Sequence, residues 1–321
     1  MSTEVCACAV SDILSDRSRR RRRRMQKKNA FTSDIHMQDT EEEEPAATAW
    51  RRAILSPTLI LDLVVCGLIG GLPEILPQNR RRTPVTSSGR EFMLDSPYMA
   101  DTVPNWALLI TATLLPLLVA IGLSVIVPTR GAVKAWLHSW LYTMGTQLLI
   151  IGSLKAYCGY WRPYFLEECA YNTTLNACTS SSYDHAFRSF PSGHAATSVA
   201  MLVHTSLRLL GALRVGTVPR VCRLGTFTYL ELDGVLTLCC LLPIFLSVWI
   251  AASRVYDNAH HPADVVGGAL VGGATATLWY FRYFHGLFGP RSHMPRHSPQ
   301  PLPPLQGHGH GQRRASPSER E

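Results

Sequence analysis

The chain alternates between long apolar segments and polar segments, a pattern typical of a helical membrane protein. Residues 108–127 and 234–253 contain no charged side chain. Each segment has about 20 residues, which as a helix cross the ~30 Å hydrocarbon core of a bilayer. The pattern therefore predicts a transmembrane helix at each of these two places.

Four further segments resemble these two but carry polar interruptions. Residues 135–154 contain His138, residues 265–281 are shorter and uncharged, residues 53–72 contain Asp62, and residues 193–207 contain His194 and His204. The segment 193–207 is the least apolar of the set. The chain is thus predicted to be an all-α, polytopic membrane protein with six transmembrane helices and both tails on one side.

Both tails are polar, and we expect them to be disordered. The first, residues 1–52, contains the basic cluster Arg17–Lys28 and the acidic run Glu41–Glu44; the second, residues 286–321, is rich in Pro, Gly and His. Averaged over the chain, 46% hydrophobic residues, a mean hydropathy of +0.06 and a net charge of +8 imitate a soluble protein. The averages conceal a six-span domain, residues 53–285, between two polar tails.

The basic residues predict the orientation of the six helices. Basic clusters near membrane segments favour the cytoplasmic side, which puts both tails there, although Arg80 to Arg82 lie on the opposite side and contradict the rule. A contact of Arg17–Lys28 with anionic lipid is a secondary expectation. Nucleic-acid binding is not expected, because no aromatic residues interleave with the arginines. The outer loops are then residues 73–104, 155–192 and 254–261.

The second outer loop has two features typical of a lumenal or extracellular segment. Asn172 begins an N-glycosylation sequon, a short motif that also arises by chance. Cys169 and Cys178 lie in the same loop and either form a disulfide or remain free thiols. None of the nine cysteines forms a CxxC pair, so no structural zinc site is expected.

Three polar motifs stand at the outer ends of the predicted helices. The first joins Lys155 to Arg162 and Pro163, seven residues apart and so predicted to share one helical face. The second is Pro191-Ser192-Gly193-His194, in which Ser192 suits a helix N-cap. The third runs from Ser253-Arg254 to His260 and Asp264, with the carboxylate four residues from the imidazole. Each motif alone has an ordinary structural explanation, but three on one face are hard to explain by packing.

Together these residues suit phosphate chemistry. Two guanidiniums, an ammonium and the free amides of a helix N-terminus attract a dianion. They also stabilise the charge on equatorial oxygens while phosphorus is five-coordinate. One histidine attacks phosphorus and the other protonates the leaving oxygen. The sequence has no dense carboxylate cluster for Mg²⁺, so neither a metal nor another cofactor is expected.

The three motifs resemble the signatures KxxxxxxRP, PSGH and SRxxxxxHxxxD of the type 2 phosphatidic acid phosphatase superfamily, the lipid phosphate phosphatases. All three are complete and in order, within roughly residues 53–285. The surroundings of the motifs look most like the eukaryotic branch. Tyr160 is a departure, because that branch often has an arginine there, and this puts the fine substrate preference in doubt.

The resemblance implies a role for each matching residue. It makes His260 the nucleophile that becomes phosphohistidine, Asp264 the residue that orients it, and His194 the acid and base. The implied phosphate-binding residues are Lys155, Arg162, Ser192, Gly193 and Arg254. The family is Mg²⁺-independent, in agreement with the interpretation of the residues themselves.

Other polar and small residues are expected to have structural roles. Asp62 is interpreted as neutral or hydrogen-bonded to a neighbouring helix, with a part in a lipid path as the alternative. His204 is interpreted as a core histidine too deep for the site, and His261 as pointing away from the site. The pairs Gly267-Gly268 and Gly272-Gly273 have the spacing of a close helix contact.

The leading hypothesis is removal of phosphate from phosphatidic acid. Alternatives are phosphatases for lysophosphatidate, sphingoid-base phosphate, diacylglycerol pyrophosphate or polyisoprenyl diphosphate. A non-catalytic lipid-phosphate-binding protein is a remote alternative, since no motif residue is lost. The membrane is that of the endoplasmic reticulum, the Golgi or the cell surface, and the sequence predicts no oligomeric state.

Overall fold

A computed structural model describes residues 45–80, 94–172, 174–175, 177–181, 183–217, 221–224 and 228–296. Residues 1–44 and 297–321 lie outside this range. Arg81 and Arg82 do so as well, and so does the central residue of the sequon. The predictions of a lipid-binding basic cluster and of disordered tails therefore fall largely outside the described residues.

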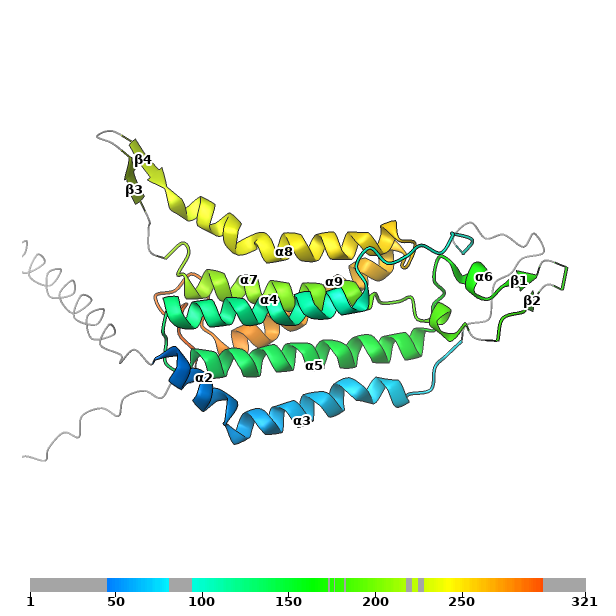
Figure 1. Ribbon diagram of the computed structural model, residues 1–321, viewed down its shortest axis with the longest axis horizontal. Helices are drawn as coiled ribbons and strands as arrows, with labels where there is room; N and C mark the ends of the chain where they lie inside the picture. Colours follow the sequence, from blue (N-terminus) through cyan, green and yellow to red (C-terminus); the bar gives the residue numbers. More distant parts are fainter. Residues whose placement is uncertain are drawn as a thin grey trace, which may run out of the picture.

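Six long helices run side by side along the bundle (Figure 1). They are α3 (Pro57–Gly71), α4 (Asn105–Ile126), α5 (Ala132–Cys158), α7 (Gly193–Ala212), α8 (Leu232–Tyr256) and α9 (Pro262–Tyr283). Each contains most of one predicted span. The short elements are α2 (Ala46–Ile54), η1 (Leu72–Ile75), α6 (Phe165–Glu168) and η2 (Asp184–Phe187), with the antiparallel hairpins β1 (Tyr171–Asn172)–β2 (Ala177–Cys178) and β3 (Val221–Leu224)–β4 (Thr228–Glu231).

Four stretches of helix in the described chain are long and apolar enough to cross a membrane. They are Pro57–Ile75, Asn105–Ile126, Gly193–Ala212 and Asp233–Tyr256. Helices α5 and α9 are also long, but polar residues and glycines dilute their apolar character. The structure thus confirms a mostly helical membrane protein, while the count of six crossings remains a prediction.

Helix α7 lies among the other helices, which explains why its sequence carries several polar residues. It contacts α4, α5, α8 and α9, and most of its residues are buried. Its polar side chains therefore face protein. By contrast, Leu68 of α3, Leu118 of α4 and Leu242 of α8 are more than half exposed, as expected for side chains that face lipid.

Glycines allow α7 and α9 to approach closely. A Cβ atom on Gly268 would lie 2.4 Å from the carbonyl oxygen of Ser192, and one on Gly272 would lie 2.4 Å from that of Ala196. Neither position has room for a side chain. The predicted close helix contact is confirmed, and it fixes the start of α9 against the start of α7.

Two isolated polar residues have the structural roles predicted for them. Asp62 of α3 accepts hydrogen bonds from α5, from the imidazole of His138 and from the hydroxyl of Tyr142 at 2.8 Å. His204 is fully buried, and its Nε2 lies 2.8 Å from the hydroxyl oxygen of Ser139. Hydrogen bonds between helices therefore account for both residues.

The described structure extends into both predicted tails. Residues 46–52, assigned to the first disordered tail, belong to α2, whose Trp50 indole donates to Ser124 of α4 at 3.1 Å. Residues 286–296 fold back on the bundle, where Arg296 donates to the carbonyl of Phe284 at 2.9 Å. The folded region therefore extends beyond the predicted range 53–285 at both ends of the sequence.

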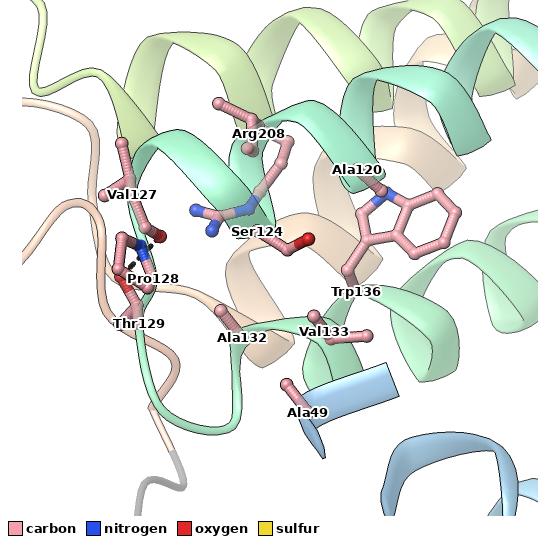
Figure 2. Close-up of a pocket in the computed structure, with 11 residues that line it drawn as sticks. Ala49, Ala120, Ser124, Val127, Pro128, Thr129, Ala132, Val133, Trp136 and Arg208 are labelled. Atoms are coloured by element: carbon pink, nitrogen blue, oxygen red, sulfur yellow. Dashed lines mark hydrogen bonds between the residues drawn. The ribbon is translucent and has the colours of Figure 1, made fainter. Parts of the chain in front are cut away.

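Arg208 of α7 helps to hold the second of these segments. Its guanidinium lies 4.5 Å from the ring centroid of Phe284 and donates to the carbonyl of His293 at 3.4 Å. Figure 2 shows the side chain beside a cavity of about 20 Å³ lined by residues of α4 and α5. Arg208 is 4% exposed, and no carboxylate in the described part of the chain pairs with it.

Candidate active site

The three motifs meet at one end of the bundle, the end that carries α6 and the β1–β2 hairpin in Figure 1. Lys155 lies in the last turn of α5, which ends at Cys158. Gly159 follows with φ +52°, where a Cβ atom would lie 1.9 Å from the carbonyl oxygen of Asn79. This close approach requires glycine and stops the helix. Arg162 therefore lies in a loop, and the prediction that it shares a helical face with Lys155 is wrong.

Ser192 caps helix α7 as predicted. Its hydroxyl oxygen accepts from the backbone N–H of Ala195 at 3.4 Å, and its own N–H donates to the carbonyl of Asp264 at 2.9 Å. A Cβ atom on Gly193 would lie 3.6 Å from Nζ of Lys155. The second motif is thus in contact with residues of both the first and the third.

Asp264 lies at the centre of the third motif and is fully buried. Its Oδ2 accepts from the hydroxyl of Ser189 at 2.5 Å and from the backbone N–H of His261 at 2.9 Å. The same oxygen lies 3.3 Å from Nδ1 of His261 and 3.7 Å from Nδ1 of His260. The carboxylate therefore sits beside both histidines, and the prediction that His261 points away is wrong.

The contacts to His260 itself are incomplete. Nδ1 of His260 and Oδ1 of Asp264 are buried, and neither has a hydrogen-bond partner. Unsatisfied buried polar atoms are uncommon and costly. A small rotation of either side chain would bring Nδ1 within hydrogen-bond distance of the carboxylate, which would orient the imidazole as the third motif predicts.

The surroundings of His260 keep its imidazole neutral. Burial, together with the nearby charges of Arg162 and Lys155, lowers the pKa of His260 to about 3 against the opposing effect of Asp264. For Asp264, burial acts to raise the pKa, but the two imidazoles and the Ser189 hydroxyl outweigh it and leave the pKa below its usual range. At neutral pH the pair is therefore a carboxylate beside a neutral imidazole.

Arg254 is buried in a network of carboxylates. Nη1 donates to Oδ1 of Asp101 at 2.8 Å, and Nη2 donates to Oδ2 of Asp257 at 2.5 Å. Nε and Nη2 also donate to the hydroxyl oxygen of Ser253, at 3.2 and 3.1 Å. The side chain is 1% exposed. Its orientation is fixed before any substrate arrives.

His194 has a defined tautomer. Its Nε2 lies 3.0 Å from the backbone carbonyl of Val103. A carbonyl oxygen only accepts hydrogen bonds, so Nε2 carries the proton. The nitrogen available for proton transfer is therefore Nδ1.

The sequence analysis did not predict four side chains that contact the motif residues: Ser189, Asp257, Asp101 and Thr102. Asp257 stood three residues after Arg254 within the third motif, so helical spacing could have revealed the pair. The other three have no local signal, because their partners lie far away in the chain.

Next to the site, the loop between α5 and α7 forms a small folded cap. Cys169 and Cys178 form a disulfide, which decides between the two alternatives left by the sequence. Phe165, Phe187 and Leu94 pack together beneath it. Asn172 is exposed at the hairpin, where its side-chain oxygen accepts from the backbone N–H of Thr174 at 2.8 Å, so its glycosylation remains a prediction.

A cavity of about 560 Å³ opens beside Arg162 and is lined by Tyr98, Tyr164, Glu167 and His185. It places open space next to one of the predicted phosphate-binding residues. In the part of the chain that the structure describes, no group of three or more His, Cys, Asp or Glu side chains is arranged to hold a metal ion.

Comparison with known proteins finds relatives of the region that carries the three motifs. The model of the PAP2 superfamily matches residues 136–286, which contain all three motifs. Lipid phosphate phosphatase 2 of Arabidopsis thaliana is 30% identical over 211 residues, covering 60% of this chain and 66% of that protein. "Probable lipid phosphate phosphatase 4" of the same plant is 30% identical over 243 residues, 70% and 71% of the two chains.

A fungal relative is named for a different lipid. "Probable diacylglycerol pyrophosphate phosphatase 1" of Schizosaccharomyces pombe is 30% identical over 201 residues, 58% of this chain and 67% of that protein. The chain thus spans about two thirds of the length of these curated relatives. No solved structure matches significantly.

The apolar helices and these relatives define the class, a phosphatase-type hydrolase with membrane helices. The chain belongs to the PAP2 superfamily, in the eukaryotic branch that includes the plant and fungal lipid phosphate phosphatases.

Proposed function

We propose that the protein removes phosphate from a lipid phosphate, with phosphatidic acid as the preferred substrate and diacylglycerol and inorganic phosphate as products. The observation that carries this proposal is the convergence of the three motifs around Asp264 at one end of an apolar bundle. A lipid headgroup would reach that end while its acyl chains stay among the exposed leucines of the helices.

The reaction would proceed in two steps. In the first, Nε2 of neutral His260 attacks phosphorus while Nδ1 faces Asp264. His194 enters this step as an imidazolium, because its Nδ1 takes up a proton from solvent as the phosphate dianion binds. The bond between phosphorus and the glycerol oxygen breaks, and the leaving oxygen takes that proton from Nδ1 of His194. This proton transfer returns His194 to the neutral tautomer with the proton on Nε2, the tautomer that the Val103 carbonyl selects.

In the second step, water hydrolyses the phosphohistidine. Nδ1 of His194 removes a proton from the water, whose oxygen attacks phosphorus as the bond to Nε2 of His260 breaks. Phosphate leaves, and both histidines regain their initial state. Lys155, Arg162, Ser192, Gly193 and Arg254 would hold the equatorial oxygens, with no metal ion or other cofactor required.

We further propose six membrane crossings, with the motifs on the lumenal or extracellular side. The disulfide supports this orientation, because disulfides persist in oxidising compartments. Arg214, which follows α7, supports a cytoplasmic opposite end under the positive-inside rule. Attachment of glycan to Asn172 in cells would test it.

Diacylglycerol pyrophosphate is the second candidate substrate, favoured by the names of two fungal relatives. Sphingoid-base phosphates, lysophosphatidate and polyisoprenyl diphosphates share the same terminal phosphate chemistry. Competition among these lipids and water-soluble phosphate esters, measured on the purified protein, would rank them.

The decisive test is phosphate release from phosphatidic acid in mixed micelles with EDTA present. The wild-type protein is expected to be active, and His260→Ala inactive. Brief reaction with ³²P-labelled substrate should label the wild-type protein with an acid-labile, base-stable phosphate that His260→Ala lacks. A need for Mg²⁺, or activity in His260→Ala, would refute the mechanism. A folded wild-type protein without activity would favour the non-catalytic alternative.

A further inference from the structure

The segment that leads into α4, residues 94–104, contacts loops that carry all three motifs. The N–H of Ser96 donates to the carbonyl of Pro163, which ends the first motif, at 3.0 Å. The side-chain amide of Asn258 in the third motif donates to the carbonyl of Pro97 at 3.1 Å. None of the three signatures includes this segment.

Thr102 donates hydrogen bonds to both carboxylate oxygens of Asp257. Its backbone N–H donates to Oδ2 at 2.9 Å, and its hydroxyl donates to Oδ1 at 2.5 Å. The same Oδ2 accepts from Nη2 of Arg254. Thr102 therefore fixes the carboxylate that fixes the guanidinium, although it does not touch Arg254 itself.

Asp101 accepts a hydrogen bond from the other terminal nitrogen of the same guanidinium, Nη1. An arginine side chain has five N–H donors. Arg254 uses four of them, two in hydrogen bonds to Ser253, one to Asp257 and one to Asp101. The remaining N–H is on Nη1, where it can donate to a substrate oxygen. Because Asp101 shares Nη1, it determines the direction in which that remaining N–H points.

Val103 completes the series through its backbone. Its carbonyl accepts the proton of His194 Nε2 at 3.0 Å and so selects the tautomer of the proposed acid and base. Three consecutive residues thus contact the third motif twice and the second motif once. A shift of this short segment would move Arg254 and His194 together.

We propose that residues 101–103 position the catalytic machinery, and that Thr102 and Asp101 are positioning residues for Arg254. This inference rests on the proposed function, in which Arg254 holds the phosphate and His194 transfers protons. Positioning acts most strongly on the transition state, since displacements of about 1 Å can cost on the order of 100-fold in rate. The segment therefore controls kcat more than substrate binding.

The test uses the full-length protein and compares Thr102→Val with Thr102→Ser. Valine keeps the shape and the backbone N–H but removes the hydroxyl, whereas serine keeps the hydroxyl. We expect Thr102→Val to lower kcat about 10- to 100-fold with KM changed less than about 3-fold. Thr102→Ser should stay within about 3-fold of the wild type in both constants.

Thr111→Val is the matched control, because the Thr111 hydroxyl donates only within α4, to the carbonyl of Ala107 at 2.7 Å. Its kcat should match the wild type. Unchanged kcat in Thr102→Val would overturn the proposal, as would equal losses in Thr102→Ser or Thr111→Val. If the wild type is active and His260→Ala is not, these results concern the positioning role alone, whereas an active His260→Ala defeats the proposed function.

Asp101→Asn gives a second, independent measurement should Thr102→Val fail to fold. The Asp101 side chain is 37% exposed, so the surroundings tolerate the change. Asparagine can still accept from Nη1 but loses the charge, and we expect kcat to fall about 3- to 10-fold with little change in KM. A rise in kcat/KM would instead mean that Asp101 competes with the phosphate for Arg254, and it would contradict the positioning role.

Discussion

Two arginines, at opposite ends of the bundle, are almost equally buried and have opposite surroundings. Arg254, at the motif end, is 1% exposed and pairs with Asp101 and Asp257. Arg208, near the end where α2 packs (Figure 2), is 4% exposed, and it contacts the ring of Phe284 and the carbonyl of His293. Burial of a guanidinium is therefore not by itself a sign of a functional site.

The difference lies in what each arginine would leave behind. Removing Arg254 would strand a carboxylate, Asp257, that is 1% exposed. Removing Arg208 would strand a carbonyl and an aromatic face, which cost far less to leave unpaired. Arg254 at the motif end is therefore part of an ion network that is costly to disrupt, whereas Arg208 at the other end makes a packing contact.

The largest effect is expected from Arg254→Met. It should lower the free energy of unfolding by about 3–5 kcal/mol, because the carboxylate of Asp257 is left buried and uncompensated. Activity should fall by at least about 100-fold, as for loss of one donor to the transition state. Unfolding by SDS in mixed micelles and phosphate release would measure the two effects.

The double variant Arg254→Met/Asp257→Leu separates them. Replacing both members of a buried ion pair by apolar residues is often neutral for stability. It should recover most of the lost stability and none of the activity. Recovery of activity would contradict a phosphate-binding role for Arg254.

A smaller effect is expected from Arg208→Met. Loss of the contacts with Phe284 and His293 should cost less than about 2 kcal/mol, and relief from burying the charge offsets part of it. Activity should remain near that of the wild type, because the residue lies away from the motifs. If Arg208→Met lowers the free energy of unfolding as much as Arg254→Met does in the same assay, the proposed difference between the two arginines is wrong.

The smallest effect concerns pH. The pKa of His260 is lowered to about 3 in the folded protein, whereas an unfolded histidine titrates near pH 6.5. Between these values the unfolded state binds more protons, so stability falls as pH falls below about 6.5. From pH 6.5 to 5.5 His260 should contribute a loss of at most about 1.4 kcal/mol.

His260→Gln should reduce this slope in the SDS unfolding assay, whereas Thr111→Val should leave it unchanged. A slope that is the same in the wild type and His260→Gln would mean that the pKa of His260 is not lowered in the folded protein, and it would contradict a buried imidazole held neutral by its surroundings.

Part of the site was predictable because it depends on the spacing of residues that are close together in the sequence. Ser192 was predicted as a cap and does cap α7, and the glycine pairs on α9 were predicted to allow a close helix contact, which they do. Each of these depends on spacing within a few residues. The same reasoning failed for Arg162, because Gly159 and its approach to Asn79 end α5 early.

The sequence by itself determined the helices, the apolar character of their outer faces and the three motifs, since each depends on residues near one another in the chain. Only the tertiary structure decided that Asp101, Thr102 and Val103 reach Arg254, Asp257 and His194. The physical reason is distance along the chain. The charge of Arg254 favours carboxylate partners, but it does not say which distant carboxylate the folded chain will bring to it.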